Sequence, residues 1–251
     1  MLSRHDTHAR YVTASLANHK PVFVEKPLAI TREQLDEIQA AVDKEKQHGL
    51  APFVMVGFNR RFAPMVVKMR ELLAATAGPK SFVMTVNAGA IPAEHWTQDP
   101  DAGGGRIVGE ACHFIDLLRH LAGAPVVSFD VTGMARAGGP PRTDVASLTL
   151  RFEDGSFGVV NYLANGHKAY PKERLEAFAG GRVLVLDNYR KLSGYGWPGF
   201  GGLSAWSQDK GQTACVAAFV AAVKRGGLAP IAPAEIFEVS RLAIEAAQRA
   251  G

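Results

Sequence analysis

In the first 58 residues, segments with apolar residues at helical spacing alternate with short runs of consecutive apolar residues. Apolar residues at helical spacing, such as Ala9, Val12 and Leu16, predict amphipathic helices. Between them lie short runs of consecutive apolar residues, typical of parallel strands buried on both faces. Helix and strand in alternation indicate a doubly wound α/β sheet. The predicted elements are a helix over 9–17, a strand over 22–24, a helix opened by the capping pair Thr31 and Gln34, and a strand over 52–57.

The pattern changes after residue 58. Strands there follow one another on tight turns such as Glu153-Asp154-Gly155, which indicates antiparallel pairing. We therefore expect two domains, a partial doubly wound domain over 1–58 and a second domain of α+β type over 59–251. The predicted elements of the second domain are helices after Pro64 and over 107–121, 211–225 and 233–249, strands over 81–88, 126–136, 145–152, 157–163, 175–179 and 183–187, and loops over 91–105 and 192–206.

Composition is that of an ordinary globular protein. The 251 residues are 47% hydrophobic and 21% charged, with a formal net charge of +4 that is not gathered into a basic run. This pattern argues against a nucleic-acid-binding protein. The two cysteines, Cys112 and Cys215, exclude a disulfide scaffold and lack the spacing of a zinc site. Without an apolar run typical of a signal peptide or a membrane span, we expect a cytoplasmic protein.

One stretch combines a buried strand with charged chemistry. Val22-Phe23-Val24 ends abruptly at Glu25-Lys26-Pro27, and proline disfavours helix in the residue before it. Lys26 is therefore expected at the carboxyl end of a strand, where ligands gather in open parallel sheets. An ammonium there can bind a substrate oxygen. Taken alone, an ordinary surface lysine is the simpler interpretation.

The helix over 107–121 carries a second candidate pair. Glu110 and His113 stand three residues apart, so they share a helical face. Histidine titrates near neutrality and can pass a proton to or from a hydroxyl group. A histidine satisfied inside the core by Glu110 or Asp116 explains the pattern equally well. A metal site has less support, because Glu-x-x-His occurs only once.

Two glycine-rich stretches are candidates for a phosphate-binding loop. Gly194-Tyr-Gly196-Trp-Pro-Gly199 matches G-x-G-x-x-G, but no helix begins directly after it, as the mechanism requires. The glycines at 103–105 precede a helix, but their antiparallel setting is wrong for a dinucleotide fingerprint. A tight turn at the rim of a pocket is the better interpretation of 103–105.

Four motifs, in this order and spacing, together resemble the Gfo/Idh/MocA oxidoreductases. The resemblance covers essentially the whole chain, and the tail from Asp209 is similar to the family's closing segment. The motifs are Ser3-Arg-His-Asp-Thr-His8, Lys20-Pro-Val-Phe-Val-Glu-Lys-Pro-Leu28, Gly57-Phe-Asn-Arg-Arg-Phe62 and Gly103-Gly-Gly-Arg-Ile-Val-Gly-Glu-Ala-Cys-His-Phe-Ile-Asp116.

The resemblance implies a fold and a set of site residues. The fold is a Rossmann domain followed by an α/β domain with a large, open, mostly antiparallel sheet that often mediates oligomerisation. Lys26 is implied to be the active-site lysine and His113 the catalytic histidine. The residues implied to line the cofactor site are Ser3, His5, His8, Glu25, Pro27, Asn59 and Arg60, and no metal is implied.

The chain departs from the family pattern in two places. The family usually carries an aspartate four residues before its histidine, where this chain has Gly109; Glu110 is the candidate to replace it. The family's first strands and glycine-rich loop have no counterpart before residue 1. The resemblance to the Rossmann domain is therefore to its C-terminal part, and we expect weak or no dinucleotide binding by this chain alone.

The expected activity is hydride transfer between NAD or NADP and a hydroxyl carbon of a sugar, polyol or sugar derivative. In this hypothesis Lys26 and His113 hold the reacting hydroxyl, Glu110 assists, and the protein forms a homo-oligomer through the antiparallel sheet. The alternative is a truncated, non-catalytic relic whose sheet serves association. A sugar-binding module using His95, Trp96, Trp197 and Trp206 has less support, since isolated tryptophans more often pack in cores.

Overall fold

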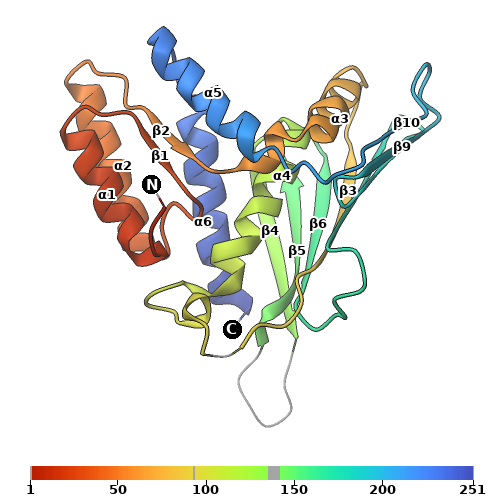
Figure 1. Cartoon of the computed structure of the whole chain (residues 1–251), viewed down its shortest axis with the longest axis horizontal. Helices are drawn as coiled ribbons and strands as arrows, with labels where there is room; N and C mark the ends of the chain where they lie inside the picture. The colour runs from red at the N-terminus through yellow and green to blue at the C-terminus, as the bar shows by residue number, and fades with distance from the viewer. Residues whose placement is uncertain (1, 93, 135–141, 251) are drawn as a thin grey trace. The chain divides into compact units, whose positions relative to one another are not determined.

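The computed structural model describes residues 2–92, 94–134 and 142–250, without the side chains of 142 and 143. The chain forms two compact units, which are described separately (Figure 1). The chain leaves the first unit after Phe58 and returns to it twice. The first unit comprises Met1–Phe58, Ala93–Asp116 and Thr213–Ala247, and the second comprises Asn59–Pro92, Leu117–Gln212 and Gln248–Gly251.

The first unit is built on a short parallel sheet. Val22 pairs with Val54 and Val24 with Val56 in a two-stranded parallel ladder. The β-branched residues of both strands are buried, as expected for strands covered on both faces. The elements of this part are η1 (His5–Thr7), α1 (His8–Ala17), β1 (Val22–Val24), α2 (Arg32–Gln47) and β2 (Val54–Val56).

The start of α2 confirms the predicted cap. The hydroxyl of Thr31 accepts a hydrogen bond from the backbone N–H of Gln34 at 3.2 Å. The Gln34 side chain reaches back one residue further than a capping box requires, and accepts from the N–H of Ile30 at 3.0 Å. These bonds satisfy donors that a helix start leaves open, and they fix the chain between β1 and α2.

Two later stretches complete the first unit. They contain η3 (Trp96–Gln98), a π-helix (Ile107–Ala111), the start of α4 (Cys112–Ala122), α5 (Gln212–Arg225) and most of α6 (Pro233–Ala250). Phe219 of α5 packs against Phe23 and Phe53, with ring centroids 5.5 Å apart in both pairs. The predicted helices over 211–225 and 233–249 are therefore confirmed, and α5 packs on the parallel pair through this aromatic residue.

The second unit is dominated by an eight-stranded sheet in the order β10-β9-β8-β7-β3-β6-β5-β4. All neighbouring strands pair antiparallel except β3 and β6, which are parallel. The sheet is thus mostly antiparallel, as predicted. The elements are η2 (Asn59–Phe62), α3 (Pro64–Ala74), β3 (Ser81–Asn87), the end of α4, β4 (Val126–Met134), β5 (Arg142–Phe152), β6 (Phe157–Leu163), β7 (Glu173–Ala179), β8 (Arg182–Asp187), β9 (Lys191–Tyr195) and β10 (Gly202–Ser204).

One face of this sheet is a packed core. Phe82, Met84 and Val86 of β3 point into it at every second position, and all three are buried. The end of α4 covers this face closely, because a Cβ on Gly158 would lie 3.1 Å from Leu118 Cδ1. The alternation therefore decides which side chains are buried and which face outward.

The stretch 192–206 was expected to be a loop, and that prediction is wrong. It contributes β9 and β10, which pair antiparallel from Gly202 opposite Ser193 to Ser204 opposite Lys191. The strands are short, and glycines break the alternation that would have identified them. The glycine stretch Gly194–Gly199 lies at the end of β9 and in the turn to β10. It is followed by a strand and not by a helix, which agrees with the argument against a phosphate-binding loop.

Other sequence expectations concern cysteines and membranes. Cys112 and Cys215 are both buried thiols in helices. None of the described helices combines the length and apolar character that a bilayer crossing requires.

A basic cluster lies at the end of α4 in the second unit. Burial, and after it the positive charges of Arg61, Arg70 and Arg119, together lower the pKa of His120 from 6.5 to about 3. The folded protein therefore keeps His120 neutral under conditions in which the unfolded chain binds a proton.

The free energy of unfolding should consequently decrease as the pH is lowered below 6.5. Between pH 6.5 and about 3 the unfolded state binds the extra proton, so His120 removes up to about 1.4 kcal/mol per pH unit from the free energy of unfolding. Denaturant unfolding of His120→Gln, compared with the parent protein from pH 6.5 down to about pH 5, should show a smaller slope. Keeping above pH 5 avoids the titration of Glu173, whose unfolded value is 4.5. His48→Gln at the exposed end of α2 is the control, and equal slopes for His120→Gln and the parent would contradict the interpretation.

Candidate functional site

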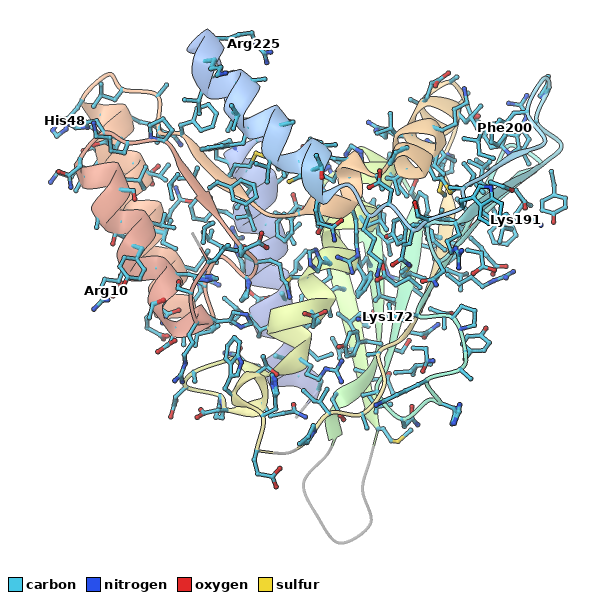
Figure 2. All side chains as sticks on the ribbon, in the orientation of Figure 1. Arg10, His48, Lys172, Lys191, Phe200 and Arg225 are labelled. Carbon is cyan, nitrogen blue, oxygen red and sulfur yellow. The ribbon has the colours of Figure 1, made fainter. Side chains whose placement is uncertain are left out.

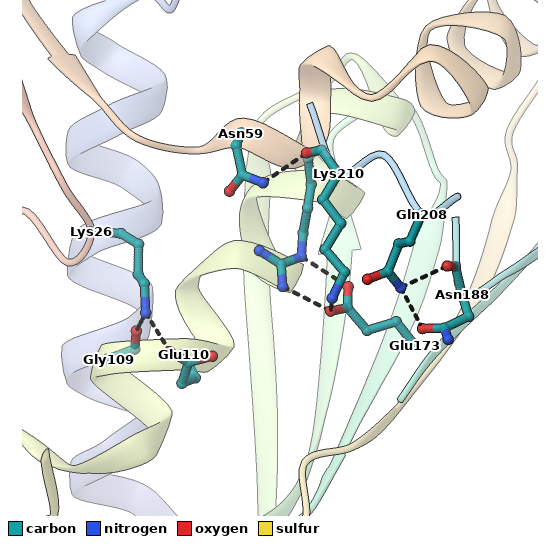
Figure 3. Close-up of polar contacts among 9 residues, drawn as sticks. Lys26, Asn59, Gly109, Glu110, Glu173, Asn188, Gln208 and Lys210 are labelled. Carbon is teal, nitrogen blue, oxygen red and sulfur yellow. Dashed lines mark hydrogen bonds and ion pairs between the residues drawn. The ribbon is translucent and has the colours of Figure 1, made fainter. Parts of the chain in front are cut away.

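Lys26 lies at the carboxyl end of β1 and turns its amine toward another part of the first unit. Its side chain is only 16% exposed. The Nζ atom donates a hydrogen bond to the carbonyl oxygen of Gly109 at 2.7 Å and forms an ion pair with the carboxylate of Glu110 (Figure 3). A charge that is largely removed from water requires such partners. The structure thus brings together two predicted catalytic residues that stand 84 positions apart.

The carbonyl that accepts from Lys26 belongs to a wide helical turn. A regular helix was predicted from residue 107, but Ile107–Ala111 is a π-helix and α4 begins only at Cys112. A π-turn loosens the usual hydrogen-bond ladder, which makes a carbonyl accessible to a side chain. Gly109 suits this turn, because a Cβ there would lie 3.1 Å from His5 Cε1. The position where the family usually has aspartate therefore contributes its carbonyl oxygen instead.

His5 packs directly against this turn. Its Nδ1 atom makes a hydrogen bond of 2.8 Å with the carbonyl oxygen of Gly103, and its ring meets Trp96 edge-on at 4.7 Å. Burial lowers the pKa of His5 below 6.5; the bond to Gly103 opposes this shift, and the charge of Lys26 adds to it. At neutral pH His5 is therefore a neutral imidazole beside the Lys26 ammonium.

His8 ties the N-terminal turn to the end of β1. It is fully buried, and its Nδ1 atom donates to the carbonyl oxygen of Pro27 at 2.7 Å. Its Nε2 atom lies 3.2 Å from the carbonyl oxygen of Ser3, whose hydroxyl accepts from Thr7. Ser3, His8 and Pro27 thus form one connected group that fixes the backbone around Lys26.

Glu25 lies against the end of the neighbouring strand. A Cβ on Gly57 would come within 2.8 Å of Glu25 Oε2, so a larger residue there would displace the carboxylate from this position. The structure therefore places the two charged residues that follow β1 in different surroundings, with Lys26 against the π-helix and Glu25 against the chain that leaves β2.

His113 lies three residues after Glu110, at the start of α4, which directly follows the π-helix. Its side chain is buried, and its ring packs beside Phe58 and Phe114 with centroids 6.3 and 6.4 Å away. Lys26 contacts the turn that leads into His113, so both belong to the first unit. The apolar neighbours restrict the ring, as a group positioned for proton transfer requires.

Asn59 and Arg60 belong to the second unit and have partners there. Asn59 Nδ2 donates to the carbonyl oxygen of Lys210 at 2.7 Å (Figure 3). Arg60 binds the carboxylate of Glu173 through two nitrogens at 2.9 and 2.8 Å, and Lys210 Nζ donates to the same carboxylate at 2.7 Å. Burial acts to raise the pKa of Glu173, but the hydrogen bond and charge of Arg60 with the charge of Lys210 outweigh it and lower the pKa to about 2.

Several of these contacts were not predicted. The partners of Arg60 lie on distant elements, and neither Glu173 nor Lys210 carries a local motif that would have revealed them. Trp96 was considered only as a sugar platform, whereas its ring packs on His5. Among the described residues, no three histidine, cysteine, aspartate or glutamate side chains are gathered closely enough to hold a metal ion.

The geometry at Lys26 can be tested through the titration of His5. Lys26→Met removes a positive charge that lowers the pKa of His5, so this pKa should rise toward 6.5. The measurement is a histidine titration by NMR, with the His5 resonance assigned from His5→Gln. Lys20→Met, before the start of β1, serves as the control for the loss of one positive charge. A His5 pKa that stays the same in Lys26→Met would contradict the described arrangement.

Comparisons with known proteins agree on one family for both parts of the chain. Residues 1–58 match the model described as "Oxidoreductase family, NAD-binding Rossmann fold", and residues 66–180 match "GFO/IDH/MocA C-terminal domain". Inositol 2-dehydrogenase 2 of Saccharopolyspora erythraea is 32% identical over 67% of this chain and 48% of its own length. Myo-inositol 2-dehydrogenase of Thermotoga maritima is 26% identical over 75% of this chain and 55% of its own length. The chain thus spans about half the length of these curated relatives.

Solved structures show the same fold. A levoglucosan dehydrogenase in complex with NADH superposes with a TM-score of 0.80 and 21% identity, over 99% of this chain and 76% of that chain. An oxidoreductase domain protein from Kribbella flavida gives a TM-score of 0.81 and 23% identity, over 98% and 76% of the two chains. The expected architecture, a partial Rossmann sheet followed by a large, mostly antiparallel sheet, is therefore confirmed.

Proposed function

Because the chain belongs to the Gfo/Idh/MocA oxidoreductase family, we propose that it acts in hydride transfer between NAD or NADP and a hydroxyl carbon of a polyol or sugar. The single observation that carries this proposal is the Lys26 ammonium, held at a strand end by the Gly109 carbonyl and Glu110. The carboxyl end of a parallel pair is where α/β proteins bind their ligands. Lys26 is thereby preorganised to meet a hydroxyl oxygen.

The residues at this strand end fit the nicotinamide part of the cofactor. The nicotinamide carboxamide carries a hydrogen-bond donor and an acceptor, and the neutral imidazole of His5, the backbone around Pro27 and the Glu25 carboxylate offer partners for them. When bound, the nicotinamide supplies the acceptor or donor of hydride. His5, His8, Glu25 and Pro27 are the residues of this chain proposed to hold it, with Ser3 supporting them through His8.

Lys26, Glu110 and His113 are proposed to manage the proton. An ammonium engaged by a carboxylate and a carbonyl serves best as a hydrogen-bond donor to the substrate oxygen. His113 then accepts the hydroxyl proton in alcohol oxidation and returns it in the reverse direction. Glu110 holds the amine in place, so it is a positioning residue for Lys26. In these roles Lys26 donates a hydrogen bond to the substrate oxygen, and His113 accepts the single proton that the hydroxyl group releases.

Steady-state kinetics test these roles. With NAD or NADP and a panel of inositols and sugars, Lys26→Met and His113→Gln should each lower kcat/KM by about 10²- to 10⁴-fold, because each removes a group that acts on the reacting hydroxyl. Lys20→Met should retain the parental activity. The loss in Lys26→Met should fall mainly in kcat if the contact strengthens in the transition state. Full activity in either site variant would overturn the proposed roles, and inactivity of the parent protein with every substrate would favour the non-catalytic alternative.

The proposed substrates are cyclic polyols and sugars. This class is supported by the two relatives described above, which are inositol dehydrogenases by name. A ring with several hydroxyl groups suits a site in which an ammonium and an imidazole act on neighbouring hydrogen-bond positions. The proposed location is the cytoplasm, in line with the described helices and with two buried thiols.

We also propose that copies of the chain associate through the outward face of the large sheet. Phe157 on β6, Phe178 on β7 and Tyr195 on β9 are 47%, 41% and 60% exposed. Strand register places them in one row: Ser81 of β3 pairs with both phenylalanines, and Val183 of β8 pairs with Phe178 and Tyr195. This row across five strands is apolar except for Ser81, and a second copy of the same sheet can cover it.

Light scattering coupled to size-exclusion chromatography tests this association. Phe178→Asp introduces a charge at the centre of the row and should shift the protein toward monomer. Val67→Asp alters an equally exposed apolar residue on α3 and should leave the assembly unchanged. A monomeric parent protein, or an unchanged assembly in Phe178→Asp, would rule out this face.

A further inference from the structure

The second unit contains a pocket that the proposed roles do not use. Its volume is about 560 Å³, which is enough for a ligand the size of a monosaccharide. It lies where β3 ends, and its wall is formed entirely within the second unit. The lining residues are Asn87, the segments 88–91 and 168–172, and Asn188.

The wall of this pocket is positively charged. Lys168 and Lys172 are its charged side chains, and its eleven lining residues include no aspartate or glutamate. Lys172 is labelled in Figure 2. The next residue along the chain, Glu173, is an acid, but two cations, Arg60 and Lys210, already bind its carboxylate. The Glu173 carboxylate is therefore compensated by these two cations.

The lysine-bearing loop is held in place by a buried amide. Asn87 is 9% exposed, and its Nδ2 atom donates to the carbonyl oxygens of His167 and Tyr170 at 2.8 and 3.1 Å. Its backbone N–H donates to the carbonyl oxygen of Lys172 at 2.8 Å. The three bonds reach both sides of the loop and connect it to the end of β3. The two lysines are thus carried on a fixed backbone, which lowers the entropic cost of binding a ligand.

Glycines bring the loop close to the sheet. A Cβ on Gly166 would lie 2.0 Å from Asn87 Oδ1, so the loop can approach the amide only with glycine there. Gly89 has a φ of +69°, and the stem of Lys168 passes 3.9 Å from the position that its Cβ would occupy. These close approaches shape the floor of the pocket and place the stem of Lys168 over it.

The other groups in the wall suit a hydroxylated ring. Tyr170 contributes an exposed aromatic ring, and such rings offer an apolar face together with a polar hydroxyl. Asn188 contributes an amide to the lining, and Gln208 Nε2 donates to its backbone carbonyl at 2.8 Å and to its side-chain carbonyl at 2.9 Å (Figure 3). A ligand that combines hydroxyl groups with a negative charge would use every kind of group in the wall.

We propose that this pocket binds a monosaccharide or cyclic polyol that carries a carboxylate or phosphate group. Lys168 and Lys172 bind the anionic group, and Tyr170 and Asn188 contact the ring and its hydroxyl groups. Binding to the pocket stands on these contacts alone and does not depend on the proposed function.

Isothermal titration calorimetry without nicotinamide cofactor tests the binding. Glucuronate and glucose 6-phosphate should bind at least about tenfold more tightly than glucose, and added NaCl should weaken the binding of both acids. The two acids also distinguish a carboxylate site from a phosphate site. Equal binding of glucuronate, glucose 6-phosphate and glucose, or binding of none, would overturn the proposal.

Matched variants locate the site. Lys168→Gln and the double variant Lys168→Gln/Lys172→Gln should lower the affinity for the preferred acid by about tenfold or more, with little change for glucose. Lys224→Gln, at the exposed end of α5, removes the same charge elsewhere and should retain the parental affinity. The single Lys168→Gln variant alters only an exposed side chain, so it remains informative if the double variant fails to fold. Unchanged affinity in Lys168→Gln and in a folded double variant would exclude this pocket.

The result of the binding test at this pocket can be distinguished from the result of the hydride-transfer test. Turnover of neutral polyols without selective binding of acids would remove this inference and leave the hydride-transfer proposal standing. Selective binding of acids by a protein that transfers no hydride would do the reverse.

Discussion

The candidate site depends on how the charge of Lys26 is compensated. An ammonium that is only 16% exposed has lost most of its water and must be bound by protein groups. The carbonyl of Gly109 and the carboxylate of Glu110 serve this purpose, and both belong to the π-helix Ile107–Ala111. Gly109 leaves room beside His5 in this turn, because a Cβ there would lie 3.1 Å from His5 Cε1. The strand end, the glycine, the widened turn and the neutral histidine are therefore parts of one arrangement, and a change in any of them alters the surroundings of the amine.

Local patterns predicted most of the elements but few of the contacts. The strand over 22–24, the cap at Thr31 and the helices from Pro64 and Pro233 follow from apolar periodicity and cap chemistry, which act over a few residues. The Gly109 carbonyl in the π-turn accepts instead from a lysine 83 positions away, a contact that no local pattern reveals, and the sequence around it reads as an ordinary helix. The hairpin of β9 and β10 was missed because its glycines hide the alternation. Lys26, Glu110 and His113 were found as candidates because each carries chemistry on a recognisable element, whereas Glu173 had no such context.

The second unit compensates its buried charges differently. Glu173 is almost fully buried and is bound by two cations, so this group of three side chains carries a net positive charge. Breaking one contact would leave a buried charge without its partner, which is far more destabilising than removing an exposed pair. The same carboxylate joins segments around residues 60 and 210, and Asn59 adds a direct bond between them. The excess of positive charge continues into the neighbouring pocket through Lys172. A cluster that stabilises the fold therefore also sets the sign of the potential around a binding surface.

The replacement of the family's usual aspartate by Gly109 bears on how the proton moves. An aspartate at that position would place a carboxylate against His5, where a single Cβ already comes within 3.1 Å of the ring. Glu110 instead directs its carboxylate to Lys26 from the next residue, and the wider π-turn provides the space. The lysine then has an anionic partner and a carbonyl partner, which suits it to donating hydrogen bonds rather than accepting a proton. In the proposed hydride transfer the acceptor role therefore goes to His113, whose ring lies beside Phe58 and Phe114. The chain thus keeps a carboxylate, an amine and an imidazole on adjoining elements, although the carboxylate comes from a different position in the sequence.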